Sequence, residues 1–139
     1  MTYFADLSEY TYSSADEKMI NVGWLGRAKA FETGGIDDGV WDELVRLASE
    51  PANVMRGLHD CEFCDTESPV RVPSNYSIKR FASLGTGEIR VRDENGRIFA
   101  APTLLLHYVW SHNYLPPEVF IQAVRALRER RMADTESGG

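Results

Sequence analysis

Residues 87–102, GEIRVRDENGRIFAAP, carry the strongest structural signal in the chain and predict a β-hairpin. Ile89 and Val91 alternate with polar residues, which is the pattern of a strand with one buried face. The Asn-Gly pair at 95–96 favours a two-residue type I′ turn, and residues 98–100 then form the return strand. Pairing across such a turn predicts one shared face made up of Ile89, Val91, Ile98 and Ala100.

A helix is predicted upstream of this hairpin. Asp37 or Asp38 can cap its N-terminus, and Pro51 ends it. Residues 52–57 then predict one short helical turn that stops at Gly57. The apolar residues that fall on one face of the longer helix are Val40, Trp41, Leu44, Val45 and Ala48.

Two further helices are predicted downstream of the hairpin. In residues 101–112, APTLLLHYVWSH, Pro102 suits the first turn of a strongly apolar and therefore buried helix. Residues 116–131, PPEVFIQAVRALRERR, begin with two prolines and form the second helix. The inner stripe of this second helix is Phe120, Ala123, Val124 and Leu127. The residues expected near its negative C-terminal end are Arg128, Arg130 and Arg131.

Helices and an antiparallel hairpin without β–α–β alternation predict an α+β fold. The 139 residues suit one domain, in which a hairpin or small sheet packs against three to four helices and zinc adds stability. We expect this domain to span residues 1–132 and residues 133–139 to form a flexible tail. Before residue 37 the sequence is less regular, but residues 2–7 and 10–13 alternate weakly and are candidate strands.

The composition is that of a globular protein, with 43% hydrophobic and 26% charged residues. A net charge of −6 opposes nonspecific attraction to nucleic acid and to anionic membranes. No stretch approaches the roughly 18 apolar residues of a transmembrane helix, and the N-terminus lacks the features of a secretory signal. We therefore expect a cytoplasmic protein whose thiols stay reduced, which disfavours a disulfide.

The two cysteines and two of the three histidines form two short motifs. Cys61 and Cys64 make a Cys-x2-Cys knuckle, and His107 and His112 make a His-x4-His pair, spacings found in structural zinc sites. On a continuous helix the two histidines are about 140° apart around the axis. They converge only if the helix ends or loosens near His112, which Asn113 and the prolines after it predict. We predict one Zn²⁺ per chain, held by all four residues.

The surroundings of the cysteines distinguish a metal site from a redox pair. The nearby carboxylates are those of Asp60, Glu62, Asp65 and Glu67. No Lys or Arg occurs between Gly57 and Ser68, although a redox thiolate needs a nearby cation. A divalent ion deprotonates the thiols itself and is favoured by carboxylates, so zinc is preferred over two inert thiols and over a redox pair. His59 is an alternative ligand, or the imidazole that stays free beside the metal.

Three motifs resemble those of small uncharacterised bacterial proteins. They are RG-x-H-x-C-x2-C at 56–64, LG-x-GEI-x-V at 84–91, and AAP-x-L-x2-HYV-x2-H-x-Y-x-PP-x2-FI at 100–121. The resemblance implies that the cysteine and histidine motifs occur together and serve one shared site. It implies no activity, because no activity is known for these proteins.

The closed ligand set and the acidic charge predict a non-catalytic cytoplasmic zinc-binding module that acts through protein contacts, as an adaptor or a neutralising partner of a basic protein. The alternative is a zinc-dependent hydrolase or nuclease, which needs three protein ligands, an open coordination position and a carboxylate base. The candidates for that base are Asp60, Glu62 and Glu88. A metal-free binding domain is the second alternative.

Overall fold

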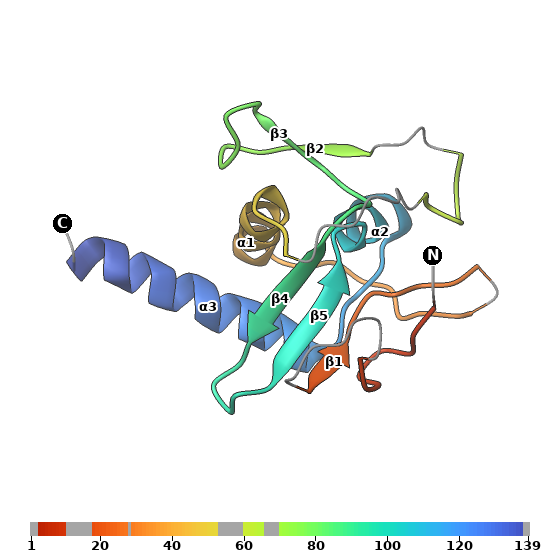
Figure 1. Ribbon diagram of the computed structural model, residues 1–139, viewed down its shortest axis with the longest axis horizontal. Coiled ribbons are helices and arrows are strands. Elements are labelled where there is room, and N and C mark those ends of the chain that lie inside the picture. Colours follow the sequence, from red (N-terminus) through yellow and green to blue (C-terminus); the bar gives the residue numbers. More distant parts are fainter. Residues whose placement is uncertain (1–2, 11–17, 28, 53–59, 66–69, 138–139) are drawn as a thin grey trace.

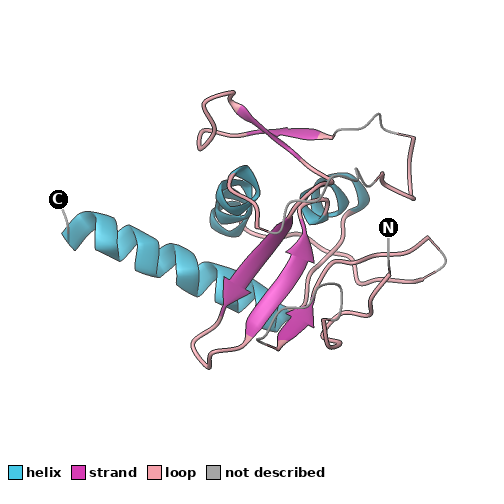
Figure 2. Cartoon of the chain, in the orientation of Figure 1, coloured by secondary structure: helices cyan, strands magenta, loops and turns pink. Residues whose placement is uncertain are grey.

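A computed structural model describes residues 3–10, 18–27, 29–52, 60–65 and 70–137 of the chain (Figure 1). The elements, coloured by type in Figure 2, are β1 (Met19–Asn21), α1 (Asp38–Ser49), β2 (Arg71–Pro73), β3 (Phe81–Ser83), β4 (Glu88–Arg92), β5 (Ile98–Pro102), α2 (Leu105–His112) and α3 (Glu118–Ser137). The described residues therefore form an α+β domain with three helices, which confirms the predicted class.

The larger sheet has three strands in the order β1-β5-β4. Strands β4 and β5 are the predicted antiparallel hairpin, whereas β1 lies parallel to β5 at the other edge. Strands β2 and β3 form a separate antiparallel pair, seen above α1 and α2 in Figure 1. Helix α1 contacts β3 and β4, and α3 contacts both α1 and β4. The helices thus connect the two sheets.

The register of the hairpin differs from the predicted one. Strands β4 and β5 pair so that Val91 lies opposite Phe99. The face that points into the core therefore consists of Ile89, Val91, Phe99 and Ala101. The prediction that Ile98 and Ala100 share this face was wrong, because the observed pairing turns both side chains to the opposite side of the sheet.

Asp93 accounts for the changed register. Its Oδ1 accepts hydrogen bonds from the backbone N–H groups of Asn95 (3.0 Å) and Arg97 (2.8 Å). Of the turn residues, only Gly96 has a positive φ (83°), whereas a type I′ turn requires positive φ at both central positions. The N–H of Asp93 bonds to the carbonyl of Arg97, so the loop holds three residues instead of two. That one extra residue exchanges the two faces of β5.

Helix α1 confirms its prediction. Asp37 is the N-cap, and its Oδ1 accepts a hydrogen bond from the N–H of Val40 at 2.8 Å. The predicted inner residues Val40, Leu44, Val45 and Ala48 are all buried. Trp41 is only partly buried, and its ring packs against that of Trp110 on α2 with centroids 5.3 Å apart.

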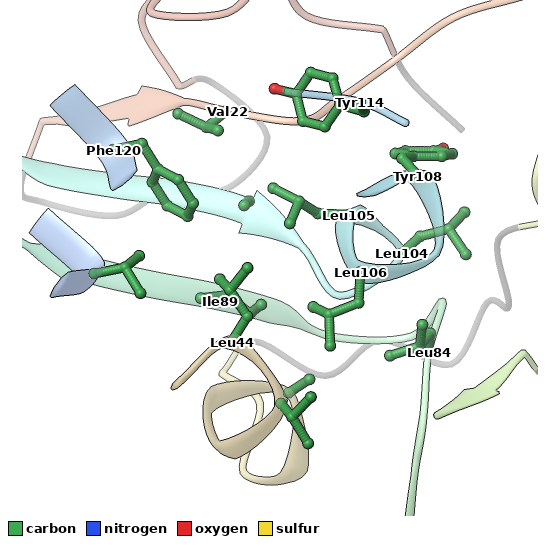
Figure 3. Close-up of a cluster of buried hydrophobic side chains, with 14 of the residues drawn as sticks. Val22, Leu44, Leu84, Ile89, Leu104, Leu105, Leu106, Tyr108, Tyr114 and Phe120 are labelled. Carbon is green, nitrogen blue, oxygen red and sulfur yellow. The ribbon is translucent and has the colours of Figure 1, made fainter. Parts of the chain in front are cut away.

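The main hydrophobic core lies between the larger sheet and the three helices (Figure 3). Ile89 points from β4 toward Leu44 of α1, and Phe120 of α3 makes an edge-to-face contact with Phe99 of β5 at 5.9 Å. The first half of helix α2 is buried as predicted, with no exposed surface on Leu105, Leu106 and Tyr108, whereas the second half is partly exposed. This burial holds α2 in a fixed position against the sheet.

The opposite face of the larger sheet is covered by the N-terminal part of the chain. Trp24 donates a hydrogen bond from Nε1 to the carbonyl of Ala100 at 3.0 Å. The hydroxyl of Tyr10 donates to the buried carboxylate of Glu88 at 2.7 Å. Both faces of β5 are therefore buried, which explains why its residues are almost all apolar.

The first strand does not lie where the sequence suggested. The candidate strand at 2–7 was wrong over residues 3–7, where the chain turns at 6–7. The turn is fixed by Asp6, whose carboxylate accepts hydrogen bonds from the N–H of Gly23 (2.9 Å) and the hydroxyl of Tyr114 (2.7 Å). The other candidate strand, beyond Tyr10, and most of the short helical turn at 52–57 lie outside the described residues.

Helices α2 and α3 begin or end at residues other than those predicted. Pro102 is the last residue of β5, and α2 begins three residues later at Leu105. Helix α3 begins at Glu118 and continues to Ser137, beyond the predicted end at Arg131, while the flexibility expected from residue 133 onward stays a prediction. The longer helix is consistent with the sequence, because no glycine or proline interrupts it before Gly138.

The inner stripe of α3 is confirmed, but the arginines near its end have another role. Phe120, Ala123 and Val124 are buried and Leu127 is partly buried. Since α3 extends to Ser137, the arginines expected at its C-terminal end lie before the last turn. Arg128 and Arg131 instead bind carboxylates of α1. Of the described helices, none is both long and apolar enough to cross a membrane.

Candidate metal centre

The four predicted ligands come from one loop and one helix. Cys61 and Cys64 lie in the loop at 60–65, His107 lies in α2, and His112 is the last residue of that helix. At Asn113 the backbone adopts a left-handed conformation (φ 57°), and its N–H bonds to the carbonyl of Tyr108. The helix therefore ends directly after the second histidine, as the sequence predicted.

The structure brings all four side chains together. One nitrogen or sulfur atom from each of Cys61, Cys64, His107 and His112 lies within 4.8 Å of every other. The Sγ of Cys61 is 3.3 Å from Nε2 of His112, and the Sγ of Cys64 is 3.3 Å from Nε2 of His107. Donors around a tetrahedral zinc ion are roughly 3.3 to 3.8 Å apart at ordinary Zn–N and Zn–S bond lengths. The four residues are thus placed where they can hold a metal ion.

The two imidazoles meet although they start from different sides of α2. Their ring centroids are 5.1 Å apart and the ring planes are nearly perpendicular, at 82°. His107 is 4% exposed, and His112, at the end of the helix, is partly exposed. One ligand of the pair is thus anchored in the core and the other lies at its edge.

Burial sets the protonation of the ligands before any ion binds. Burial raises the pKa of the Cys61 thiol, and the neighbouring Cys64 raises it further. The N–H of Phe63, whose nitrogen is 3.4 Å from Sγ of Cys61, lowers this pKa but by less than burial raises it. Burial also lowers the pKa of His107, and the neighbouring His112 lowers it further. Without an ion, burial therefore favours a neutral Cys61 thiol and a neutral His107 imidazole. A divalent ion displaces the thiol protons and accepts the imidazole as it is.

Aromatic side chains surround the centre, and the sequence analysis did not identify them. The ring of Phe63, between the two cysteines, lies 5.5 Å from that of His112 and 5.7 Å from that of Tyr108. Phe31 contacts Phe63 from the other side, at 5.4 Å. These rings form an apolar wall, which limits the access of water to the ligands. The only signal in the sequence was the position of Phe63 inside the Cys-x2-Cys motif.

A cation reaches the cysteine loop from a distant part of the chain. The Nε of Arg27 donates a hydrogen bond to the carbonyl of Glu62 at 2.8 Å. Arg27 lies outside the segment from Gly57 to Ser68, so the composition of that segment does not reveal it. The bond ends on a backbone carbonyl, and it positions the loop that carries both thiols.

The other candidate residues that the structure describes are not part of the cluster. His59 and Glu67 lie outside the described residues. Asp60 and Glu62 are described but are not among the clustered donors. The carboxylate of Glu88 binds Tyr10 and Arg90 on the covered face of the sheet. Of the bases considered for a hydrolase, none is therefore found among the clustered donors in the described part of the chain.

Comparison with known proteins identifies a family but no activity. No curated protein and no solved structure matches the chain. A family model described as a domain of unknown function (DUF7919) matches residues 2–125, which include all four clustered ligands. The chain is a member of the DUF7919 family.

Proposed function

We propose that this protein is a zinc-binding module whose metal centre is structural, and that it acts through contacts with another protein. The observation that carries the proposal is the mutual approach of four ligand atoms to within 4.8 Å. Two cysteines and two histidines are a ligand set of structural zinc sites. Four protein ligands occupy all the positions of a tetrahedral ion, which leaves none for a reactive water.

The donor atoms favour zinc over other ions. Thiolate and imidazole together suit zinc, whereas Mg²⁺ and Ca²⁺ require oxygen ligands. The proposal includes a cytoplasmic location, because thiols remain reduced there and available to the metal. In this setting the ion joins the loop at 60–65 to helix α2.

Two features support a role in protein contacts. The net charge of −6 suits a basic partner. Trp110 is 74% exposed although it lies on the helix that carries both histidines, and its ring packs on that of Trp41. Exposed tryptophans contribute much of the binding energy at many protein interfaces. Affinity capture with the intact chain and with Trp110→Ser tests this role, and a partner retained equally by both would argue against this surface.

Metal analysis of protein purified without chelators tests the centre. We expect about one zinc per chain in the unchanged protein, and loss of zinc in Cys61→Ser and in His107→Ala. His59→Ala is the matched control and should retain the metal. Absence of zinc from the unchanged protein would favour the metal-free binding domain, and full zinc in both variants would refute the assignment of the ligands.

Cobalt substitution separates a structural centre from a hydrolase. A closed Cys2His2 site should give the absorption spectrum of tetrahedral cobalt with thiolate ligands, unchanged by added cyanide. A catalytic site keeps an exchangeable position, so an added ligand would alter the spectrum. Such a change would support the zinc-dependent hydrolase or nuclease instead.

A further inference from the structure

A positively charged hollow lies where helices α1 and α3 meet, away from the metal ligands. Its volume is about 470 Å³, and it is lined by Arg46, Leu127, Arg130, Arg131 and Asp134. Three of these five residues are arginines, in a chain where acidic residues outnumber Lys and Arg by 21 to 15. We therefore ask whether contacts within the protein account for all three arginines.

The buried carboxylate of Glu43 holds two of the arginines in place. Arg46 donates from Nε (2.8 Å) and Nη2 (2.5 Å) to Oε2 of Glu43. Arg131 donates from Nε (3.1 Å) and Nη2 (2.7 Å) to the other oxygen, Oε1. The guanidinium of Arg131 also lies over the ring of Tyr76, 5.7 Å from its centroid. Both guanidinium groups therefore have fixed orientations, although their side chains are 22% and 26% exposed.

The neighbouring ion pairs between the same helices show that one arginine per carboxylate is enough to join them. Asp37 pairs with Arg125, and Asp42 pairs with Arg128. Glu43 alone is shared by two arginines, one from each helix. Joining α1 to α3 accounts for Arg131, but it does not require Arg46.

Arg130 adds a third positive charge at the hollow. Its side chain is exposed, and no carboxylate among the described residues pairs with it. Asp134 is the only acidic residue among the described residues of the lining, and within this set the guanidinium groups outnumber the carboxylates even when Glu43 is included. The arrangement combines two oriented guanidinium groups with one adaptable group beside them.

We propose that this hollow is a binding site for a small molecule that carries a phosphate or diphosphate group. Guanidinium groups form paired, charge-assisted hydrogen bonds with phosphate oxygens. Orientation by Glu43 in advance of binding reduces the entropy lost on association. The site is independent of the metal centre, so it stands or fails separately from the zinc assignment.

Titration of the zinc-loaded protein with inorganic phosphate and with pyrophosphate, at constant ionic strength, tests the proposal. We follow the Nε–H signals of Arg46 and Arg131 by NMR, because these signals report the hollow even if pyrophosphate also attracts metal ions. We expect saturable shifts, with tighter binding of pyrophosphate. Arg130→Gln should weaken binding at least about fivefold, which corresponds to about 1 kcal/mol.

Arg125→Gln is the matched control. It removes the same charge from the same helix but lies outside the hollow, and it should change the affinity less than twofold. Both residues are exposed or partly exposed on α3, so both variants should fold. Absence of saturable shifts, or equal weakening by the two substitutions, would overturn the proposal, because equal weakening means attraction by overall charge only.

Discussion

The metal centre and the Glu43 cluster both join parts of the chain that are far apart in sequence, but they do so by opposite means. At the metal centre, two thiols and two imidazoles face one another across separations of 43 and 51 residues. At the helix pair, a carboxylate faces two guanidinium groups, one of them 88 residues away. The second cluster contains its own opposite charges. The candidate metal centre becomes a strong link only when an ion supplies the positive charge.

This difference predicts what each cluster contributes to stability. Thiol and imidazole groups 3.3 Å apart form weak hydrogen bonds at most. A zinc ion held by the four residues would replace these contacts with four coordinate bonds, and its binding free energy would then add to the folding free energy. The Glu43 cluster needs no bound ion. Removal of its carboxylate leaves the guanidinium groups of Arg46 and Arg131 without that partner, which destabilises the fold.

The largest effect is expected from removal of the metal. Stripping zinc with a chelator should lower the free energy of unfolding more than any single substitution in the ion pairs between α1 and α3, because the centre then loses its bonds although the core remains. For a domain of this size the melting temperature should fall by roughly 10 °C or more. Thermal unfolding before and after chelation, with zinc measured in both samples, checks this expectation.

A matched variant controls for direct effects of the chelator. Cys64→Ser should already melt at the lower temperature, and chelator should not lower it further. If verified removal of zinc does not change the melting temperature of the unchanged protein, the centre is not structural. The proposed contrast between the metal centre and the Glu43 cluster would then be wrong.

The next largest effect is expected at Glu43. Glu43→Gln removes the charge that balances Arg46 and Arg131 and should cost about 2 to 3 kcal/mol. Asp42→Asn is the control, because Asp42 also pairs with an arginine of α3 but is 41% exposed, whereas the Glu43 side chain is fully buried. It should cost less than about 1 kcal/mol in urea unfolding. Equal losses would mean that burial does not distinguish the two pairs.

Local patterns in the sequence were enough to predict some of these features. The α1 helix, its Asp37 cap and its inner face follow from a 3.6-residue period and one side-chain hydrogen bond. The cysteines and histidines that lie close together are those of two short motifs, and the helix end after His112 follows from the residues after it. Each of these features depends on residues close together in the chain.

The features that the sequence did not predict depend on single side chains or distant partners. The hairpin register changed because the carboxylate of Asp93 binds two backbone N–H groups, and a one-residue change exchanges the faces of a strand. Three residues at 19–21 are too few to show alternation, so the parallel strand β1 could not be recognised. The partners of Arg27 and Arg131 lie 35 and 88 residues away, and a charge pattern does not identify such pairs.

A pH titration sharpens the comparison at Glu43. Burial alone would raise the pKa of this carboxyl, but the hydrogen bonds from Arg46 and Arg131 outweigh it, so the pKa lies below its ordinary value. A lowered folded pKa means that the ionised group stabilises the fold above the unfolded pKa, which is about 4.3. That stabilisation is lost as the pH falls through the folded pKa.

The difference in unfolding free energy between the unchanged protein and Glu43→Gln should therefore be constant near neutral pH and should shrink below about pH 4. We expect it to decrease steadily between pH 6 and pH 3.5. Release of zinc in acid affects both proteins and largely cancels in this difference. A difference that grows in acid would mean that the pKa of Glu43 is raised instead.

The smallest effects are expected where the same helices meet near the start of α1. Arg125→Gln removes an ion pair whose side chains are 39% and 52% exposed, so it should change the free energy of unfolding only slightly. Asp37→Ala removes the same pair and also the cap on the N–H of Val40, and should cost about 1 kcal/mol. Urea unfolding of the two variants tests whether Asp37 stabilises the fold mainly as a cap. If the two losses are equal, the ion pair is the main contribution, and exposed charges join these helices more strongly than the comparison with Glu43 implies.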